Sequence, residues 1–135
     1  MTKFRSVSLT FTLIFISLIA VAQEKGIVPQ QILRQIVQGM PKGEKQEVRV
    51  LTAEFQPGER TVLHSHRYPV TVYVLEGEFT LEADGRAPQT VKAGHAMIMP
   101  THVKMTGYNR SSSEPLRVVA FYVSDPDTPF LDPIH

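Results

Sequence analysis

The chain has 135 residues, with 14 Lys and Arg residues, 13 Asp and Glu residues and no cysteine, so its formal net charge is +1. This length favours one domain, and the lack of cysteine excludes disulfides and thiol chemistry. No basic run of the kind that neutralises phosphates is present, so we expect no nucleic-acid partner.

The first residues have the features of a cleaved signal peptide. Lys3 and Arg5 precede an apolar run over residues 7–20, and residues 20–22 form an A-x-A pattern. The run is shorter than the roughly 20 residues that a membrane helix needs. We therefore expect cleavage of residues 1–22, a periplasmic or secreted protein, and no membrane association after cleavage. Loss of Lys3 and Arg5 would lower the basic count from 14 to 12 against 13 acidic residues.

Residues 28–38 are predicted to form a short helix. Pro29 suits the first helical turn, whereas Gly39 and Pro41 end the segment. One apolar stripe runs along this helix, formed by Ile32, Leu33, Ile36 and Val37. We expect the stripe to pack on the rest of the domain or on a partner subunit, and residues 40–46 to form a connector.

From residue 47 onward the hydrophobic period changes to two, which predicts short strands separated by turns. The expected strands cover residues 47–55, 62–66, 70–76, 79–83, 90–92, 95–99, 103–108 and 116–123. Asp84-Gly85 is a hairpin signal, and the nearly continuous apolar run at 116–123 predicts a strand that is buried on both sides. The sequence therefore predicts an all-β barrel or sandwich.

The C-terminal tail, residues 124–135, is rich in proline and cannot form a helix or a central strand. Phe130 and Leu131 are its large apolar side chains beside the prolines, and we expect them to pin the tail to the surface. No internal repeat and no second domain are indicated. The expected organisation is a signal peptide (1–22), an N-terminal helix and connector (23–46), a barrel (47–123) and the tail.

His64 and His66 are the most informative residues for function. They lie two positions apart, so on an extended strand both imidazoles point to the same face. Two neutral imidazoles on one face can hold one divalent metal ion. The alternative is that His-x-His occurs by chance and that the rings are half exposed, because a competent metal site needs more ligands.

The surrounding residues resemble the first signature motif of the cupin family, which has the form Gly-x5-His-x-His-x3-Glu-x6-Gly. Gly58, His64, His66 and Gly77 are in register with it, but Val70 stands at the position of the glutamate. The resemblance covers roughly residues 46–123. It implies a single antiparallel jelly-roll barrel, with a short helix before it in this chain.

A second and weaker match begins at Gly94 and includes Pro100 and Asn109. In the family the segment is written Pro-x-Gly-x2-His-x3-Asn, but here His102 replaces the glycine and Met105 replaces the metal-binding histidine. The resemblance therefore implies only two of the four usual metal ligands.

The resemblance implies a divalent transition metal, which could be copper, iron, manganese, nickel or zinc. His64 and His66 would hold it, with Met105 or His102 as a third ligand. A thioether beside two imidazoles favours copper. The alternatives, which we prefer, are that Met105 is an apolar core residue and His102 a solvent-facing loop residue. His95 is expected at the surface.

Val70 and Val72 lie on the face that lines the barrel in cupins, and Tyr108 could close the same pocket with its hydroxyl, as could Tyr68. We expect a small organic molecule in this pocket. One hypothesis is a metal-dependent enzyme of the oxygenase or isomerase type, and the alternative is a non-catalytic binding protein without metal. No Gly-x-Ser-x-Gly nucleophile and no phosphate-binding glycine loop occur. A homodimer is expected by analogy with the family, because barrel edge strands tend to be covered.

Overall fold

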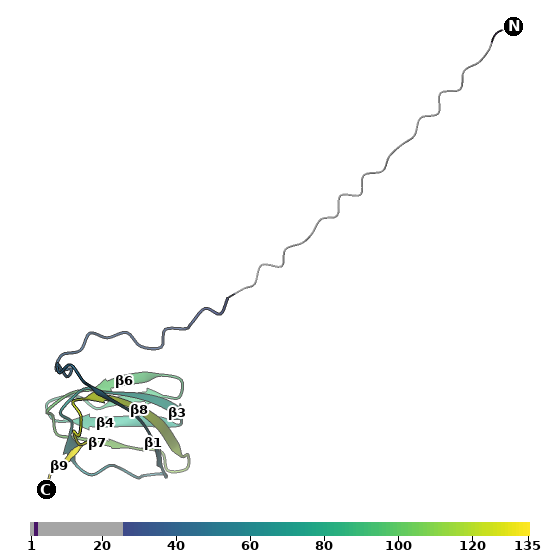
Figure 1. Ribbon diagram of the computed structural model, residues 1–135. Coiled ribbons are helices and arrows are strands. Elements are labelled where there is room, and N and C mark those ends of the chain that lie inside the picture. Colours follow the sequence, from purple (N-terminus) through teal and green to yellow (C-terminus); the bar gives the residue numbers. More distant parts are fainter. Residues whose placement is uncertain (1, 3–25) are drawn as a thin grey trace.

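The computed structural model describes Thr2 and residues 26–135 (Figure 1). The predicted signal peptide, apart from Thr2, lies outside the described residues. The strands are β1 (Glu47–Phe55), β2 (His64–Ser65), β3 (Val70–Glu76), β4 (Glu78–Ala83), β5 (Gln89–Lys92), β6 (Ala96–Met99), β7 (Met105–Tyr108), β8 (Leu116–Ser124) and β9 (Asp132–Pro133).

The strands form two antiparallel sheets that face each other. The first, sheet A, has the order β1-β8-β3-β6, and the second, sheet B, has the order β5-β4-β7-β2-β9. Most strands that are neighbours within a sheet are not consecutive in sequence, as the position of β8 between β1 and β3 shows, whereas β4 and β5 are consecutive. The predicted fold class, an all-β jelly-roll barrel, is therefore confirmed.

Alternation along β3, β6 and β8 builds sheet A's side of the core between the sheets. In β3, Val70, Val72 and Val74 are 0–2% exposed, while Thr71 and Tyr73 between them are partly exposed. A strand directs successive side chains to opposite faces, so every second residue reaches the interior. Asp84-Gly85 makes the predicted β4–β5 hairpin turn, where Gly85 has a φ of 73° that a side chain would resist.

The predicted helix at residues 28–38 is wrong. Residues 26–46 contain no helix, and the segment leads away from the barrel as an extended chain (Figure 1). Ile36 is 99% exposed and Ile32 is 42% exposed, whereas Leu33 and Val37 are partly buried, so the stripe does not pack on the barrel as one face. A single helix of this length needs such packing to be stable. Within the residues that the structure describes, no helix has the length and hydropathy to cross a membrane.

Two predictions about the C-terminal third also need correction. Strand β8 is not buried on both sides, because its side chains alternate and Phe121 is 44% exposed on the outer face of sheet A. The tail does not merely touch the surface. It adds β9 to sheet B as an edge strand beside β2, where Asp132 pairs with Ser65 and Pro133 pairs with His64. Proline is tolerated there because an edge strand leaves one row of N–H groups unused.

Candidate functional site

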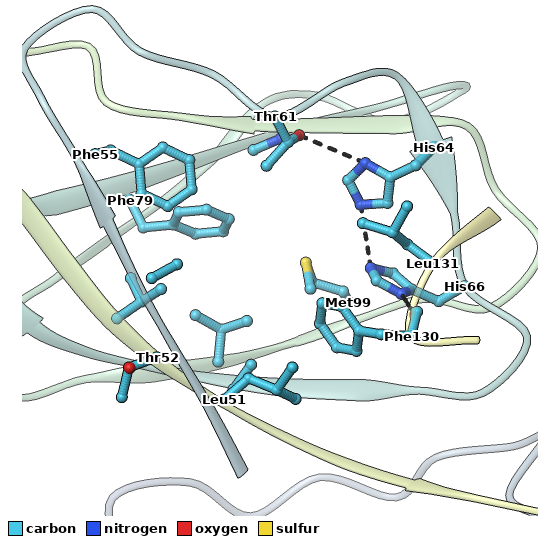
Figure 2. A pocket seen from close by; sticks show the side chains of 15 residues that line it. Leu51, Thr52, Phe55, Thr61, His64, His66, Phe79, Met99, Phe130 and Leu131 are labelled. Carbon is cyan, nitrogen blue, oxygen red and sulfur yellow. Dashed lines mark hydrogen bonds between the residues drawn. The ribbon is translucent and has the colours of Figure 1, made fainter. Parts of the chain in front are cut away.

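His64 and His66 point into the barrel and meet each other. Their rings are 3% and 1% exposed, and the centroids lie 4.8 Å apart with the planes at 80°. The two Nε2 atoms are 3.1 Å apart (Figure 2). The expectation that both imidazoles share one face is met, although β2 itself contains only His64 and Ser65. Val62, expected on the same face, is instead 61% exposed.

Each histidine is oriented by a backbone carbonyl. His64 Nδ1 lies 2.7 Å from the carbonyl oxygen of Val62, and His66 Nδ1 lies 2.6 Å from that of Phe130. A carbonyl oxygen can only accept, so both Nδ1 atoms carry a proton and donate it. When both rings are neutral, each Nε2 atom is therefore left with a lone pair.

The short contact between the Nε2 atoms consequently needs a third participant. Two lone pairs 3.1 Å apart repel each other, and either an additional proton or a cation between them removes the repulsion. Two nitrogen ligands at about 2.0–2.1 Å from one metal ion lie roughly 2.9–3.4 Å apart when they occupy adjacent positions. The pair therefore fits two neighbouring coordination positions, and the Nδ1–H···O=C bonds are those that orient metal-ligating histidines.

Burial disfavours the charged form of His66. The pKa of His66 is lowered from 6.5 to about 4, mainly because burial removes water from the imidazolium. The hydrogen bond to Phe130 opposes this shift, whereas the charge of His64 adds to it. His66 is therefore neutral near pH 7, which is the form that can bind a metal.

The pair forms one end of a cavity of about 160 Å³ inside the barrel. Figure 2 shows the imidazoles on one side, the rings of Phe55 and Phe79 on the other, and the sulfur of Met99 pointing between them. The remaining wall consists mostly of aliphatic and small residues from both sheets: Leu51, Thr52, Ala53, Thr61, Val72, Gly107, Val118, Ala120, Phe130 and Leu131.

Glycine at position 107 allows one wall of this cavity to form. A Cβ atom at Gly107 would come within 2.6 Å of the Phe79 ring, so any side chain there would push the ring from its place. The Gly107 N–H donates to Thr61 Oγ1 at 3.0 Å, and this hydroxyl lies 3.4 Å from His64 Nδ1. Strand β7 thus supports both the aromatic wall and the loop that precedes His64.

The role of the C-terminal tail is not evident from the sequence. Phe130 accepts the His66 hydrogen bond, its ring lies 5.0 Å from the His66 ring, and it packs edge-on against Tyr122 at 5.4 Å. Leu131 lines the cavity beside it. The only sequence signal was that these two residues are large and apolar among prolines, which indicates a packed segment but not its partner.

Met105 and Val70, two residues at the family's metal-ligand positions, lie outside the cavity lining. Met105 pairs directly with His64 across β2 and β7 and is 1% exposed, but it is absent from the residues that line the cavity. Val70, at the family's glutamate position, is fully buried and does not line the cavity either, whereas Val72 does.

His102 is exposed in a left-handed backbone conformation with φ of 56°, and its N–H donates to the carbonyl oxygen of His66. The backbone of His102 therefore lies next to that of His66, whereas the His102 side chain is directed to solvent. His95 is exposed, as expected. Across residues 26–135, no group of three or more His, Cys, Asp or Glu side chains is arranged to hold a metal ion.

The two tyrosines expected to close the pocket serve other contacts. Tyr108 donates to Glu82 Oε1 at 2.7 Å and stacks under Arg60, whose Cζ lies 4.7 Å from the ring centroid. It does not line the cavity. Tyr68 donates to Asp125 Oδ2 at 2.6 Å and so helps to hold the start of the tail. Both positions correct the sequence-based expectation.

Comparison with solved structures agrees with this architecture. A cupin-like protein from Thermotoga maritima is 22% identical, with a TM-score of 0.55, over 64% of this chain and 64% of its own. An RmlC-like cupin with a double-stranded β-helix fold from Methanocaldococcus jannaschii is 21% identical, with a TM-score of 0.53, over 75% and 94%. A chain from the crystal structures of DMSP lyases is 12% identical, with a TM-score of 0.55, over 65% and 44%.

At these identities the likeness concerns the fold alone, and the match spans less than two thirds of the Thermotoga chain. No curated protein matches this sequence. The sequence does match the family described as Cupin domain over residues 51–122, which is more than half of the chain. With the barrel and the inward-facing histidine pair, this match shows that the chain belongs to the cupin family.

Proposed function

We propose that this cupin binds a small organic molecule in its barrel, next to a divalent transition metal held by His64 and His66. The observation that supports the proposal is the convergence of two Nε2 lone pairs 3.1 Å apart at the wall of an apolar cavity. Preformed apolar cavities with a few convergent polar groups are the usual form of small-molecule sites.

The chain itself would supply two imidazole ligands to the metal. A bound cation would add a Lewis acid with open positions beside the cavity, as an oxygenase or isomerase requires. The role of His64 and His66 is then to hold the cation, and the role of Phe130 is to fix the His66 ring. Because only two such ligands converge, we expect affinity below that of sites with three or four.

The second candidate is a non-catalytic binding protein that works without a metal. It is favoured by Val70, which puts a buried aliphatic side chain where the family motif has a glutamate, and by Met105, which replaces the third histidine. In this case the Nε2 atoms would accept hydrogen bonds from the ligand.

Metal binding to the purified, chelator-treated protein tests the first candidate. Isothermal titration with Cu²⁺, Ni²⁺, Zn²⁺ and Mn²⁺ should give one equivalent for the wild type and none for His64→Ala/His66→Ala. The control is His95→Ala/His135→Ala, which also removes two histidines but leaves the pair intact. Equal binding by both double variants would contradict the metal site, and wild-type protein that takes up no metal would favour the second candidate.

Export and self-association belong to the same proposal. The charged, apolar and A-x-A segments of residues 1–22 support secretion, and an N-terminus beginning at Gln23 in exported protein would verify it. The outer face of sheet A supports a homodimer, because Val48, Val50 and Phe121 are 69%, 61% and 44% exposed side by side on β1 and β8. Sedimentation as a monomer at high concentration would contradict the dimer.

A further inference from the structure

The chemistry of the cavity wall restricts what the barrel can hold. Among the described residues, those that line it include no lysine, arginine, aspartate or glutamate. The aromatic rings of Phe55, Phe79 and Phe130 supply much of the surface. A charged group placed there would lose its water without gaining an ion pair, which is strongly unfavourable.

The histidine pair at the polar end of the cavity accepts hydrogen bonds and does not donate them. Both Nδ1 protons are given to the carbonyl oxygens of Val62 and Phe130, so the two Nε2 atoms present only lone pairs. Thr61 Oγ1, the nearest hydroxyl, accepts the Gly107 N–H and keeps its own proton to donate. A ligand whose polar atom carries a proton is therefore complementary to the histidine pair.

The volume of the cavity limits the size of the ligand. A cavity of about 160 Å³ is close to the roughly 150 Å³ apolar cavity that holds a benzene molecule in another protein. One six-membered ring with one substituent is thus the largest flat group that the barrel takes without displacing wall residues. A second fused ring would have to move Phe79, Met99 or the tail.

We propose that the ligand class of this barrel is a neutral, single-ring apolar molecule with one hydroxyl group, of the phenol type, with the hydroxyl at the His64–His66 pair. This inference rests on the proposed small-molecule function and narrows it. The hydroxyl proton is donated to an Nε2 atom, and the ring lies among Phe55, Phe79 and Met99. When a cation occupies the pair, the same oxygen faces it.

Four probes separate the parts of this proposal. Metal-free wild-type protein is titrated at pH 8 with phenol, benzene, benzoate and 2-naphthol, and binding is followed by calorimetry and by chemical-shift changes at Gly107 and Val72. Phenol should bind at least about 10-fold more tightly than benzene, because benzene leaves the acceptors without a donor. Benzoate, which is anionic, and 2-naphthol, which has two rings, should not bind measurably.

The same change, alanine to leucine, at two positions locates the binding site. Ala120→Leu on β8 fills the cavity and should abolish phenol binding. Ala96→Leu adds the same volume on β6, outside the cavity lining, and should leave phenol binding unchanged. Retained phenol binding in Ala120→Leu would place the ligand elsewhere and overturn the proposal.

The other possible results of the titrations test the hydroxyl contact, the restrictions on charge and size, and the ligand class. Equal affinity for benzene and phenol overturns the hydroxyl contact, and binding of benzoate or 2-naphthol overturns the restriction on charge or size. If none of the four probes binds, the ligand class is wrong. The metal titration then decides separately whether the proposed function survives, because it does not depend on the organic probe.

Discussion

The two sheets of this barrel are built in different ways. In sheet A, β1 and β8 pair over nine consecutive positions, from Glu47 with Ser124 to Phe55 with Leu116. In sheet B, β2 pairs with β7 at one position and with β9 at two. Sheet A is held mainly by its backbone ladder and its core side chains. The histidine strand of sheet B depends on side-chain bonds to the tail.

This difference shows how the cupin barrel combines stability with a site. The regular sheet supplies a fixed wall, and the irregular sheet lets two residues turn their rings toward each other. A long regular ladder would direct His64 and His66 side by side, about one strand repeat apart. The Phe130 carbonyl and the short β2 bring the Nε2 atoms to 3.1 Å instead. Four measurements test this difference between the sheets.

The largest effect is expected in the core of sheet A. Leu116→Ala removes a fully buried side chain on β8 and should lower the free energy of unfolding by about 3 kcal/mol or more, because it leaves a cavity. Phe121→Ala, on the exposed face of the same strand, should cost less than about 1 kcal/mol. Urea unfolding of the three proteins measures both values, and similar losses would refute the view that β8 stabilises the barrel through its inner face.

Acid should destabilise the metal-free protein through His66. Its pKa is about 4 in the folded state and 6.5 in the unfolded state, so the unfolded chain takes up the proton first as the pH falls. The stabilising contribution is complete above pH 6.5 and is lost progressively toward pH 4, by about 3 kcal/mol in total.

Urea midpoints measured between pH 7.5 and 4 test this dependence. In His66→Gln, the free energy of unfolding should depend less on pH over this range. The difference in slope should correspond to up to one fewer proton taken up on unfolding. An unchanged slope would show that other groups are responsible for acid sensitivity.

A smaller loss is expected from the tail. Phe130→Ala removes a partly buried ring that packs on His66 and Tyr122, and should cost about 2 kcal/mol. The effect should be local to sheet B. Hydrogen exchange of the Ile134 N–H, which donates to the Leu63 carbonyl, should accelerate more than exchange of sheet A amides such as Val72. Uniform acceleration would show that the sheets unfold as one unit.

The smallest effect is expected for the ion pair at the tail. Arg67 contacts Asp132 through Nε and Nη2 at 2.9 Å each, but both side chains are exposed to solvent, so Arg67→Ala should lower the stability less than Phe130→Ala does. The loss should shrink further in 1 M NaCl, where surface charges are screened. A loss as large as that of Phe130→Ala that persists in salt would assign the tail's attachment to this pair rather than to Phe130.

Much of the fold could be predicted because it depends on local patterns. The two-residue period of Val70, Val72 and Val74 specifies an inner face whatever strand lies opposite, and the glycines of the motif mark turns by their backbone freedom. The prediction of a helix at 28–38 was wrong because a helix depends on contacts outside its own segment. A helix of this length needs its whole apolar stripe to be packed, and in this chain Ile32 and Ile36 stay exposed.

The sequence alone determined the strand period, the barrel class and the shared face of His64 and His66, because each follows from alternation over a few residues. The folded chain was needed to show that Phe130, 64 positions from His66, orients the His66 ring, and that Tyr108 and His102 point away from the cavity. These contacts join segments that are distant along the chain. Periodicity states which side of a strand a residue occupies, whereas its partner depends on how the sheets and the tail come together.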